Sequence, residues 1–325
     1  MTRIGYALSS EEHTPNTLVD NAVAAEEAGF EFALISDHFH PWVDAQGHAP
    51  FVWSIIGGIA RATKRLELGT GVTCPTMRTH PAIIAQAAAT VGAMMPGRFF
   101  LGVGTGENLN EHILAEKWPE YDVREEMLEE AVEVIRLLWE GEQVSHYGSY
   151  YSLENARVYD VPEPRSPIHV AASGPKAAEM AGRIGDGLIS VGPNKEVVQA
   201  FREAGGEGKP VYGQLTICWA ASKDEAVKTA HRIWPNAAIK GETSQELPVP
   251  AHFEQLAESV TPEMMAEALP CGPDPEPIIE LFRQYEEAGF DHVYLHQVGP
   301  DQQGFFKFFQ EELQPALGQV GATTG

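Results

Sequence analysis

Residues 32–42 read FALISDHFHPW, an apolar run that stops abruptly at an aspartate, two histidines and a tryptophan. The first five residues are typical of a buried strand in length and composition. Charged and aromatic side chains at the end of such a strand have no packing reason to be there, so they indicate a site. Residues 66–75 (LELGTGVTCP) and 99–111 (FFLGVGTGENLNE) repeat the arrangement. Three strands with polar groups at their carboxyl ends predict the active face of a parallel α/β protein.

Strand-like and helix-like segments alternate along nearly the whole chain. The candidate strands are Arg3–Leu8, Phe32–Ser36, Leu66–Thr70, Phe99–Val103, Ile168–Ala172, Gly187–Ser190, Val211–Ala220 and His292–Gln297. The candidate helices between them are Thr17–Ala28, Phe51–Thr63, Pro81–Met95, Glu126–Trp139, Pro175–Ile184, Lys195–Ala204 and Pro275–Ala288. Eight strand–helix units predict an α/β fold, a (β/α)8 TIM barrel, and we expect residues 1–325 to form a single domain.

Short internal repeats support the predicted barrel, and two segments are longer than a minimal barrel needs. Residues 26–30 and 286–290 both read EEAGF, which places a glycine where a helix ends in a left-handed turn before a strand. A segment at about 143–161 is predicted to be a hairpin. A second segment, at about 234–262, is rich in proline and follows the seventh strand. We expect the second insertion to cover the mouth of the site, since it leaves the barrel at that end.

Composition and charge narrow the class of protein. The net charge of −24 over 325 residues argues against a nucleic-acid partner, because phosphate contacts need clustered Lys and Arg. The acidic residues are spread along the chain, so we interpret them as a solvated surface. The sequence has neither a run of 18 apolar residues nor a signal-peptide pattern. The three cysteines, Cys74, Cys218 and Cys271, lie far apart in the sequence. Together these features predict a cytoplasmic protein with a small-molecule substrate and no membrane partner.

Two motifs suggest other functions but lack the accompanying residues that those functions require. Residues 102–106 (GVGTG) resemble a dinucleotide fingerprint, but the spacing is GxGxG and no acidic ribose partner follows. Residues 38–40 (HFH) would suit a metal-dependent amidohydrolase. The ends of the later strands, at residues 171–174 and 190–193, supply no further ligands, and His296 alone is insufficient. We therefore expect no metal site.

Taken together, the segments resemble the luciferase-like superfamily of flavin and deazaflavin oxidoreductases. They are most similar to the branch of the coenzyme F420-dependent glucose-6-phosphate dehydrogenases. The resemblance is carried by residues 36–42 (SDHFHPW), 47–51 (GHAPF), 69–72 (GTGV), 100–111 (FLGVGTGENLNE) and 182–187 (GRIGDG). It runs nearly end to end and is strongest before residue 190. It implies a barrel with coenzyme F420 lying across the carboxyl ends of the strands, and a homodimer.

The resemblance also implies catalytic roles for three side chains beside the reactive ring. His38 would take the proton of a substrate hydroxyl as hydride leaves the same carbon, since histidine titrates near neutrality. Glu107 would give a proton to a ring nitrogen, a role that requires a raised pKa and hence burial. Trp42 would stack near the ring and shape the path of the hydride.

Other positions are implied to bind the cofactor. These are Asp37, Gly71, Val72, Cys74, Gly106, Glu107, Asn110, Ala172, Ser173 and Gly174. Asp37 would accept hydrogen bonds from the cofactor or orient His38, and Asn110 would bond the polar edge of the ring. The peptide between Gly71 and Val72 would be cis. The turn at residues 172–175 would offer backbone N–H groups to the cofactor phosphate.

The chain departs from this family where a sugar phosphate would bind. Val191 and Asn194 stand where threonine and lysine are expected, with Lys195 beside them, and Ser244 and Gln245 replace a Lys-His pair. Each lost charge-assisted hydrogen bond removes about 1.5–3 kcal/mol. We therefore expect hydride transfer between F420 and a small alcohol or carbonyl compound, and not glucose 6-phosphate.

Three alternatives stay open. The first is an F420-dependent sugar-6-phosphate dehydrogenase. The second is an FMN-dependent luciferase-like monooxygenase, which tightly bound FMN and oxygen consumption would distinguish. The third, a deazaflavin-binding protein without catalysis, is disfavoured because both His38 and Glu107 are present.

Overall fold

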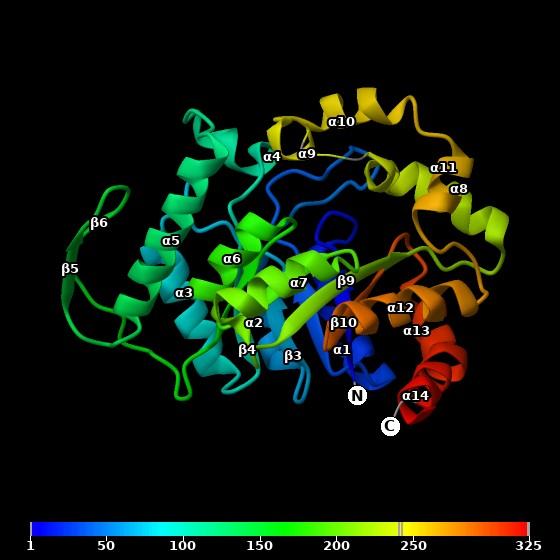
Figure 1. The fold of residues 1–325 in the computed structure, drawn as a ribbon, viewed down its shortest axis with the longest axis horizontal. Helices are drawn as coiled ribbons and strands as arrows, with labels where there is room; N and C mark the ends of the chain where they lie inside the picture. Colours follow the sequence, from blue (N-terminus) through cyan, green and yellow to red (C-terminus); the bar gives the residue numbers. More distant parts are fainter. Residues whose placement is uncertain (1, 240, 242, 324–325) are drawn as a thin grey trace.

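Eight parallel strands close into a barrel that helices surround (Figure 1). The computed structural model describes residues 2–239, 241 and 243–323, with side chains as far as residue 318. Around the barrel the strand order is β1-β10-β9-β8-β7-β4-β3-β2. Their bounds are β1 Arg3–Leu8, β2 Phe32–Ile35, β3 Glu67–Thr70, β4 Phe99–Val103, β7 Ile168–Ala171, β8 Gly187–Val191, β9 Val211–Ile217 and β10 His292–Gln297. The predicted (β/α)8 barrel is confirmed.

Seven helices of the outer layer correspond to the predicted segments, most of them with shifted ends, and two helices near the carboxyl terminus were not predicted. Their bounds are α1 Pro15–Ala28, α2 Val52–Ala62, α3 Pro81–Met94, α5 Tyr121–Leu138, α6 Pro175–Ile184, α7 Lys195–Phe201, α12 Glu276–Ala288, α13 Gln302–Phe308 and α14 Gln314–Thr323. Helix α5 begins five residues before the predicted start. Among the residues that the structure describes, no helix is both long and apolar enough to cross a lipid bilayer.

The EEAGF repeats end helices as the sequence indicates. Gly29 follows α1 with φ 99°, and Gly289 follows α12 with φ 97°. Both values lie in the left-handed region that glycine adopts without steric cost. The phenylalanine after each glycine, Phe30 or Phe290, is buried and leads into the next strand. The same five residues therefore form the same helix–strand connection at two places in the barrel.

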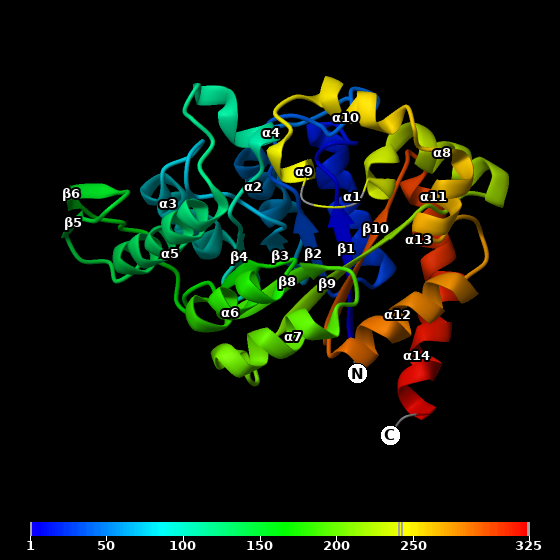
Figure 2. The same ribbon diagram turned by 45° about the horizontal axis from the view of Figure 1, so that its top comes forward.

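The two insertions lie in different places. Strands β5 (Val144–Tyr147) and β6 (Ser152–Ala156) form an antiparallel hairpin that projects from the side of the molecule near α5. The other insertion carries the helices α8 Lys223–Ile233, α9 Thr243–Glu246, α10 Pro250–Ala257 and α11 Pro262–Ala268. Figure 2 shows α9 beside the short helix α4 (Asn108–Glu111) at one end of the barrel. The Asn108 side chain donates to the Glu246 carbonyl oxygen at 2.9 Å.

A backbone bridge fastens the second insertion to the barrel. The N–H of Cys218 donates to the Pro270 carbonyl at 2.9 Å, and the N–H of Gly272 donates to the Cys218 carbonyl at 3.0 Å. Cys218 and Cys271 are thus neighbours in space, although they lie far apart in the sequence; both are free thiols. The segment that carries α8 to α11 therefore begins and ends at the same point on the barrel.

An aromatic layer closes the amino-terminal end of the barrel. Tyr212 lies 5.3 Å from Phe32, 5.0 Å from Phe100 and 4.2 Å from His292, measured between ring centroids. Gly69 makes room for this layer, because a Cβ atom there would lie 1.9 Å from Cε2 of Phe100. Aromatic side chains therefore fill this end of the barrel, opposite the carboxyl ends of the strands.

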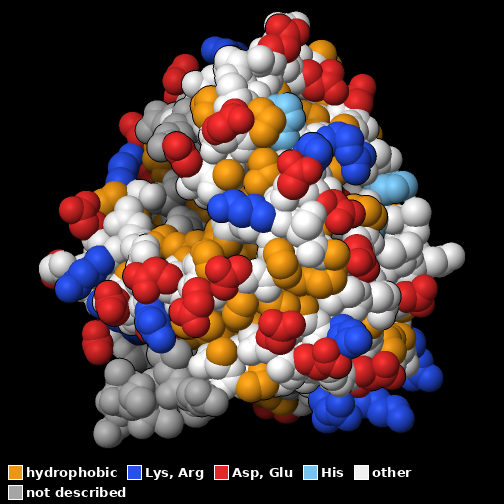
Figure 3. Space-filling view, turned by 90° about the vertical axis from the view of Figure 1, so that its right-hand side faces the viewer, with side chains coloured by type: hydrophobic (Ala, Val, Ile, Leu, Met, Phe, Trp, Pro, Cys, Tyr) orange, Lys and Arg blue, Asp and Glu red, His pale blue; other side chains and the backbone are white. Residues whose placement is uncertain are grey.

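The acidic surface matches the pattern in the sequence. Figure 3 shows one face of the molecule, on which acidic side chains are scattered among lysines, arginines and apolar side chains that gather near the centre of the view. They do not gather into one patch on this face, which fits a solvated acidic surface.

We expect Gly69→Ala to lower the free energy of unfolding by about 1–3 kcal/mol, because the added methyl group must displace the buried Phe100 ring. Urea unfolding measures this difference. Gly57→Ala is the matched control, since no atom lies within 4 Å of its Cβ position. That variant should be as stable as the wild type or gain up to about 1 kcal/mol. Equal stability of the two variants would contradict the proposed packing.

Candidate active site

A cavity of about 740 Å³ opens at the carboxyl ends of the strands. Every residue that the sequence analysis assigns to the site lines it: Asp37, His38, Trp42, Gly71, Val72, Cys74, Gly106, Glu107, Asn110, Ala172, Ser173 and Gly174. The insertion contributes residues from α9 and the segment before it: Trp234, Asn236, Gly241, Ser244 and Gln245. The structure therefore brings together residues from all eight barrel strands or the loops that follow them, together with one insertion.

His38 lies between two carboxyl groups. Its Nδ1 is 3.1 Å from the His40 carbonyl oxygen, which can only accept, so Nδ1 carries the proton. The other nitrogen, Nε2, is 3.4 Å from Oε1 of Glu11 and 3.6 Å from Oε2 of Glu107. Burial disfavours the charged imidazolium, but the two carboxylates outweigh burial and raise the pKa of His38 above its ordinary value.

The pKa values of the two carboxyl groups are shifted in opposite directions from their ordinary values. Burial raises the pKa of Glu107 above its ordinary value, against the opposing effect of His38. Burial also acts on Glu11, but the charge of His38 and a 2.6 Å hydrogen bond from Ser36 hold the pKa of Glu11 below its ordinary value. One imidazole is thus flanked by an ionised carboxylate and by a carboxyl group that retains its proton more readily. This divergence is the pattern of an acid–base site.

Glu11 was missed by the reasoning from sequence. It follows β1 in the run Ser9-Ser10-Glu11-Glu12, which is a polar end to a buried strand like the three that were recognised. The side chain is 3% exposed and contacts the imidazole that was predicted to be catalytic. Polar residues directly after an apolar strand indicate a site, and the same argument applied to the first strand identifies Glu11.

Asp37 belongs to a second polar network. Its Oδ2 accepts from the Thr73 hydroxyl at 2.7 Å, and its Oδ1 accepts from Nη2 of Arg78 at 3.0 Å. The backbone N–H of Arg78 donates to Oε2 of Glu111 at 2.9 Å. The suggested role of Asp37 in orienting His38 is not what the structure shows, because Glu11 contacts that ring while Asp37 bonds Arg78 and Thr73. Sequence reasoning did not identify Arg78 or Glu111 either.

Asn110 and Trp42 fix the loop that carries His38. Oδ1 of Asn110 accepts from the backbone N–H groups of Phe39 at 2.9 Å and His40 at 3.2 Å, and Nδ2 donates to Oε2 of Glu107 at 3.2 Å. All of these bonds are to protein groups. The Trp42 ring lies 5.1 Å from the His38 ring and 5.2 Å from the Phe253 ring in α10, so it joins the loop that carries His38 to the insertion.

Small residues line one part of the cavity, and backbone N–H groups and a hydroxyl line another. The Gly71–Val72 peptide is cis, as the resemblance implies. Gly106 has φ 81°, and a Cβ atom there would lie 2.6 Å from Sγ of Cys74. At the other end, the turn at Ala172–Gly174 leads into α6, and the buried hydroxyl of Ser190 has no hydrogen-bond partner among the described residues. These features fit a planar ring with a phosphate-bearing tail.

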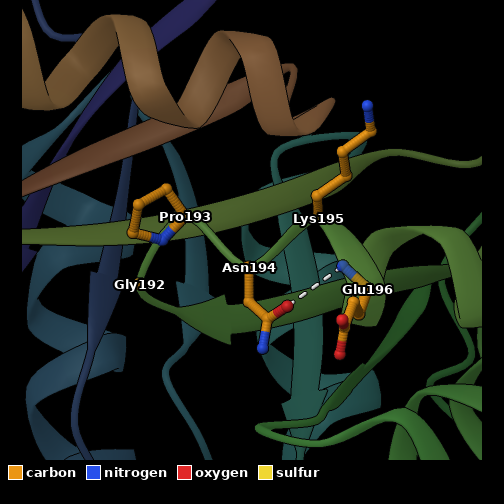
Figure 4. Close-up of a pocket in the computed structure, with 5 residues that line it drawn as sticks. All are labelled: Gly192, Pro193, Asn194, Lys195 and Glu196. Atoms are coloured by element: carbon orange, nitrogen blue, oxygen red, sulfur yellow. Dashed lines mark hydrogen bonds between the residues drawn. The ribbon is translucent and has the colours of Figure 1, made fainter.

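Positive charge is scarce around the cavity. Among the described residues that line it there is no lysine or arginine. Lys195 borders a separate shallow depression with Gly192, Pro193, Asn194 and Glu196 (Figure 4). There the Asn194 side chain accepts from the Glu196 N–H at 3.0 Å and caps α7, while the Lys195 side chain points away from it. Lys195 therefore does not replace the missing cations.

Comparison with known proteins places this geometry in context. The family model described as luciferase-like monooxygenase matches residues 1–292. The F420-dependent glucose-6-phosphate dehydrogenase of Microbacterium testaceum (strain StLB037) is 38% identical over 327 residues, which is 97% of each chain. The protein of the same name from Mycobacterium tuberculosis (strain ATCC 25618 / H37Rv) is 38% identical over 333 residues, covering 98% of this chain and 99% of its own.

Solved structures show the same fold. An F420-dependent secondary alcohol dehydrogenase in complex with an F420-acetone adduct is 32% identical, with a TM-score of 0.89 over 97% of this chain and 99% of its own. The coenzyme F420-dependent tetrahydromethanopterin reductase from Methanopyrus kandleri is 22% identical, with a TM-score of 0.77 over the same shares. The second likeness concerns the fold alone.

We expect Glu11→Gln to lower the pKa of His38, because a carboxylate that favours the imidazolium is removed while burial remains. Histidine ring signals followed by NMR against pH measure this, with His38 assigned from a His38→Asn sample. Glu31→Gln is the control, since Glu31 pairs with Arg3 at the opposite end of the barrel. A His38 pKa that is unchanged in Glu11→Gln would show that this carboxylate does not govern the imidazole.

Proposed function

The chain belongs to the luciferase-like monooxygenase family, and from this premise we propose that it is a coenzyme F420-dependent dehydrogenase or reductase. Its proposed substrate is a small, uncharged alcohol or the corresponding carbonyl compound. The observation that carries the proposal is the placement of His38 between Glu11 and Glu107 in a cavity with no described lysine or arginine. We further propose a homodimer in the cytoplasm.

The cavity residues divide into those that would hold the cofactor and those that would act on the substrate. When bound, F420 supplies a carbon that accepts or donates hydride. Gly71, Val72 and Gly106 would lie against its ring, and the N–H groups of the Ala172–Gly174 turn, with the Ser190 hydroxyl, would bind its phosphate. The relatives that are named for F420 support this assignment.

The acid–base work falls to His38 and its two carboxyl neighbours. Nε2 of His38 takes the proton of the substrate hydroxyl during oxidation and returns it during reduction. Glu11, ionised beside it, stabilises the imidazolium that forms. Glu107 is the group that would give a proton to a basic atom of the bound ring, because burial raises the pKa of Glu107 above its ordinary value. Trp42 covers His38 and limits the access of water.

The charge of the cavity favours an uncharged substrate. Its described ionisable side chains include Glu11, Asp37, Glu107 and Glu111. The Arg78 guanidinium group, which does not line the cavity, is already paired with the carboxylates of Asp37 and Glu111. A phosphate dianion placed here would be repelled by carboxylates without a charge-assisted hydrogen bond in return. The sugar-phosphate reading, supported by the names of the relatives, is therefore the second candidate.

Cofactor and substrate can be tested together. We expect intrinsic tryptophan fluorescence to be quenched on titration with F420 and unaffected by FMN. Loss of F420 absorbance should follow addition of 2-propanol but not of glucose 6-phosphate. Lys195→Ala should leave both results unchanged, because Lys195 lies outside the cavity. Turnover of glucose 6-phosphate that depends on Lys195 would favour the second candidate, and binding of FMN alone would favour a monooxygenase.

The role of His38 has its own test. His38→Ala should lower kcat by about 10²–10⁴-fold while the Kd for F420 changes by less than about tenfold. In the wild type, kcat/KM for alcohol oxidation should rise with pH through the raised pKa of His38, since only the neutral imidazole accepts a proton. Stopped-flow kinetics and fluorescence titration measure the two effects. Equal loss of turnover and binding would assign His38 a structural role.

Glu107→Gln should lower turnover and leave the affinity for F420 within about tenfold, because the amide keeps the shape of the side chain but has no acidic proton to give. Asn110 loses only one partner on this change. The same two measurements apply, and Glu203→Gln, an exposed change beyond α7, is the control. Turnover that stays at the wild-type rate would remove Glu107 from the mechanism.

A further inference from the structure

A second buried carboxylate–histidine pair lies in the wall of the cavity. Oε1 of Glu12 is 3.2 Å from Nε2 of His296, and both side chains are 3% exposed. The other carboxylate oxygen accepts from the N–H of Gly299 at 2.7 Å. The Trp234 ring packs edge-on against the imidazole, with centroids 4.5 Å apart. His296 is thus fixed in position, and the chemistry proposed for His38 does not use it.

The contacts continue from His296 into strand β9. Thr216 is the register partner of His296 on the adjacent parallel strand, and Gln214 is the partner of Tyr294. Oγ1 of Thr216 is 3.4 Å from Nδ1 of His296 and 3.3 Å from Nε2 of Gln214. Both His296 and Gln214 line the cavity. We call the chain Glu12, His296, Thr216 and Gln214 the Glu12 relay.

The polarity of the Glu12 relay follows from its last member. The amide nitrogen of Gln214 only donates hydrogen bonds, so Oγ1 of Thr216 accepts from it. The Thr216 hydroxyl hydrogen can then be donated to Nδ1 of His296, and in this arrangement Nε2 of His296 faces Oε1 of Glu12 as a donor. This leaves the Gln214 carbonyl oxygen, Oε1, with no bond to another described residue. The relay therefore presents an acceptor to the cavity.

A second residue of the same wall has a carbonyl oxygen that no described group pairs with, although that atom is itself shielded from the open cavity. Oδ1 of Asn236 is buried without a hydrogen-bond partner among the described residues, and Asn236 lines the cavity two positions after Trp234. Since Trp234 packs on His296, this residue belongs to the wall that the relay supports. Carbonyl acceptors suit a hydroxyl donor and disfavour the oxygen atoms of phosphate or carboxylate, which have no proton to give.

We propose that Gln214, held in one orientation by the Glu12 relay, binds a second hydroxyl group of the substrate, separate from the hydroxyl that is oxidised. The substrate class is then an uncharged polyol and the corresponding hydroxyketone. Thr216, His296 and Glu12 are positioning residues for this contact. The proposal deepens the proposed function and rests on it, because the same cavity serves both.

The test compares two alcohols that differ by one hydroxyl group, 2-propanol and 1,2-propanediol. For the wild-type enzyme with F420, kcat/KM for the diol should exceed that for the mono-alcohol by about tenfold. Thr216→Val, which keeps the shape but removes the hydroxyl, and Gln214→Leu should bring this ratio close to one, chiefly through KM of the diol. Thr216→Ser should retain it. Thr90→Val, an exposed change on α3, is the matched control and should also retain it.

Binding without turnover supplies an independent readout. Saturation-transfer NMR should show stronger contact of the diol than of the mono-alcohol with the wild type, and no difference with Thr216→Val. A ratio near one in the wild type, or a preference that survives in Thr216→Val and Gln214→Leu, would overturn the proposal. Absence of F420-dependent turnover, together with a diol preference in binding that Thr216→Val abolishes, would refute the proposed function and support the role of Gln214.

Discussion

The guanidinium group of Arg78 holds together the three loops on which the site depends. It bonds Asp37 after β2 and Glu111 in the helix after β4, while Arg78 itself follows β3. All three side chains are at most 10% exposed. Removal of one partner of a buried ion pair typically costs about 3–5 kcal/mol, because the remaining charge is left uncompensated. With two carboxylates on one cation, the loops that carry His38, the cis peptide and Glu107 are fixed relative to one another.

This network also explains why neighbouring carboxyl groups behave differently. Asp37 and Glu111 share Arg78, whereas Glu11 and Glu107 share only the imidazole of His38. Of the latter pair, Glu11 receives hydrogen bonds from two serine hydroxyls and stays ionised, while Glu107 receives one bond from an amide and has a raised pKa. Burial raises the pKa of both carboxyl groups, but at Glu11 the charge of His38 and the Ser36 hydrogen bond outweigh burial, whereas at Glu107 burial outweighs the effect of His38.

The fold and the position of the site could be read from local sequence patterns. Apolar runs of strand length, polar residues after them and glycine-terminated helices are properties of neighbouring residues, and they indicated the barrel and a site at the carboxyl ends of its strands. The roles predicted for His38 and Glu107 came from the resemblance to the F420-dependent branch. Arg78, the Glu12 relay and the bridge at Cys218 join segments from different strands, so only the closed barrel brings them together. Glu11 is the exception, since its place after β1 was visible in the sequence. Lys195 is close in sequence to residues that line the cavity, but its side chain borders a separate depression, so sequence position alone was misleading here.

The bridge between Cys218 and the Pro270–Gly272 segment affects how the insertion can evolve. The chain leaves the barrel after β9 and returns to the same point some fifty residues later, with backbone hydrogen bonds closing the loop. The segment between forms a module that this bridge joins to the barrel and that side-chain contacts, such as the Asn108–Glu246 hydrogen bond, hold in place, while the residues proposed to bind the cofactor belong to the barrel. Evolution, or an engineer, can exchange that module between relatives and so alter what enters the cavity without rebuilding the machinery beneath it.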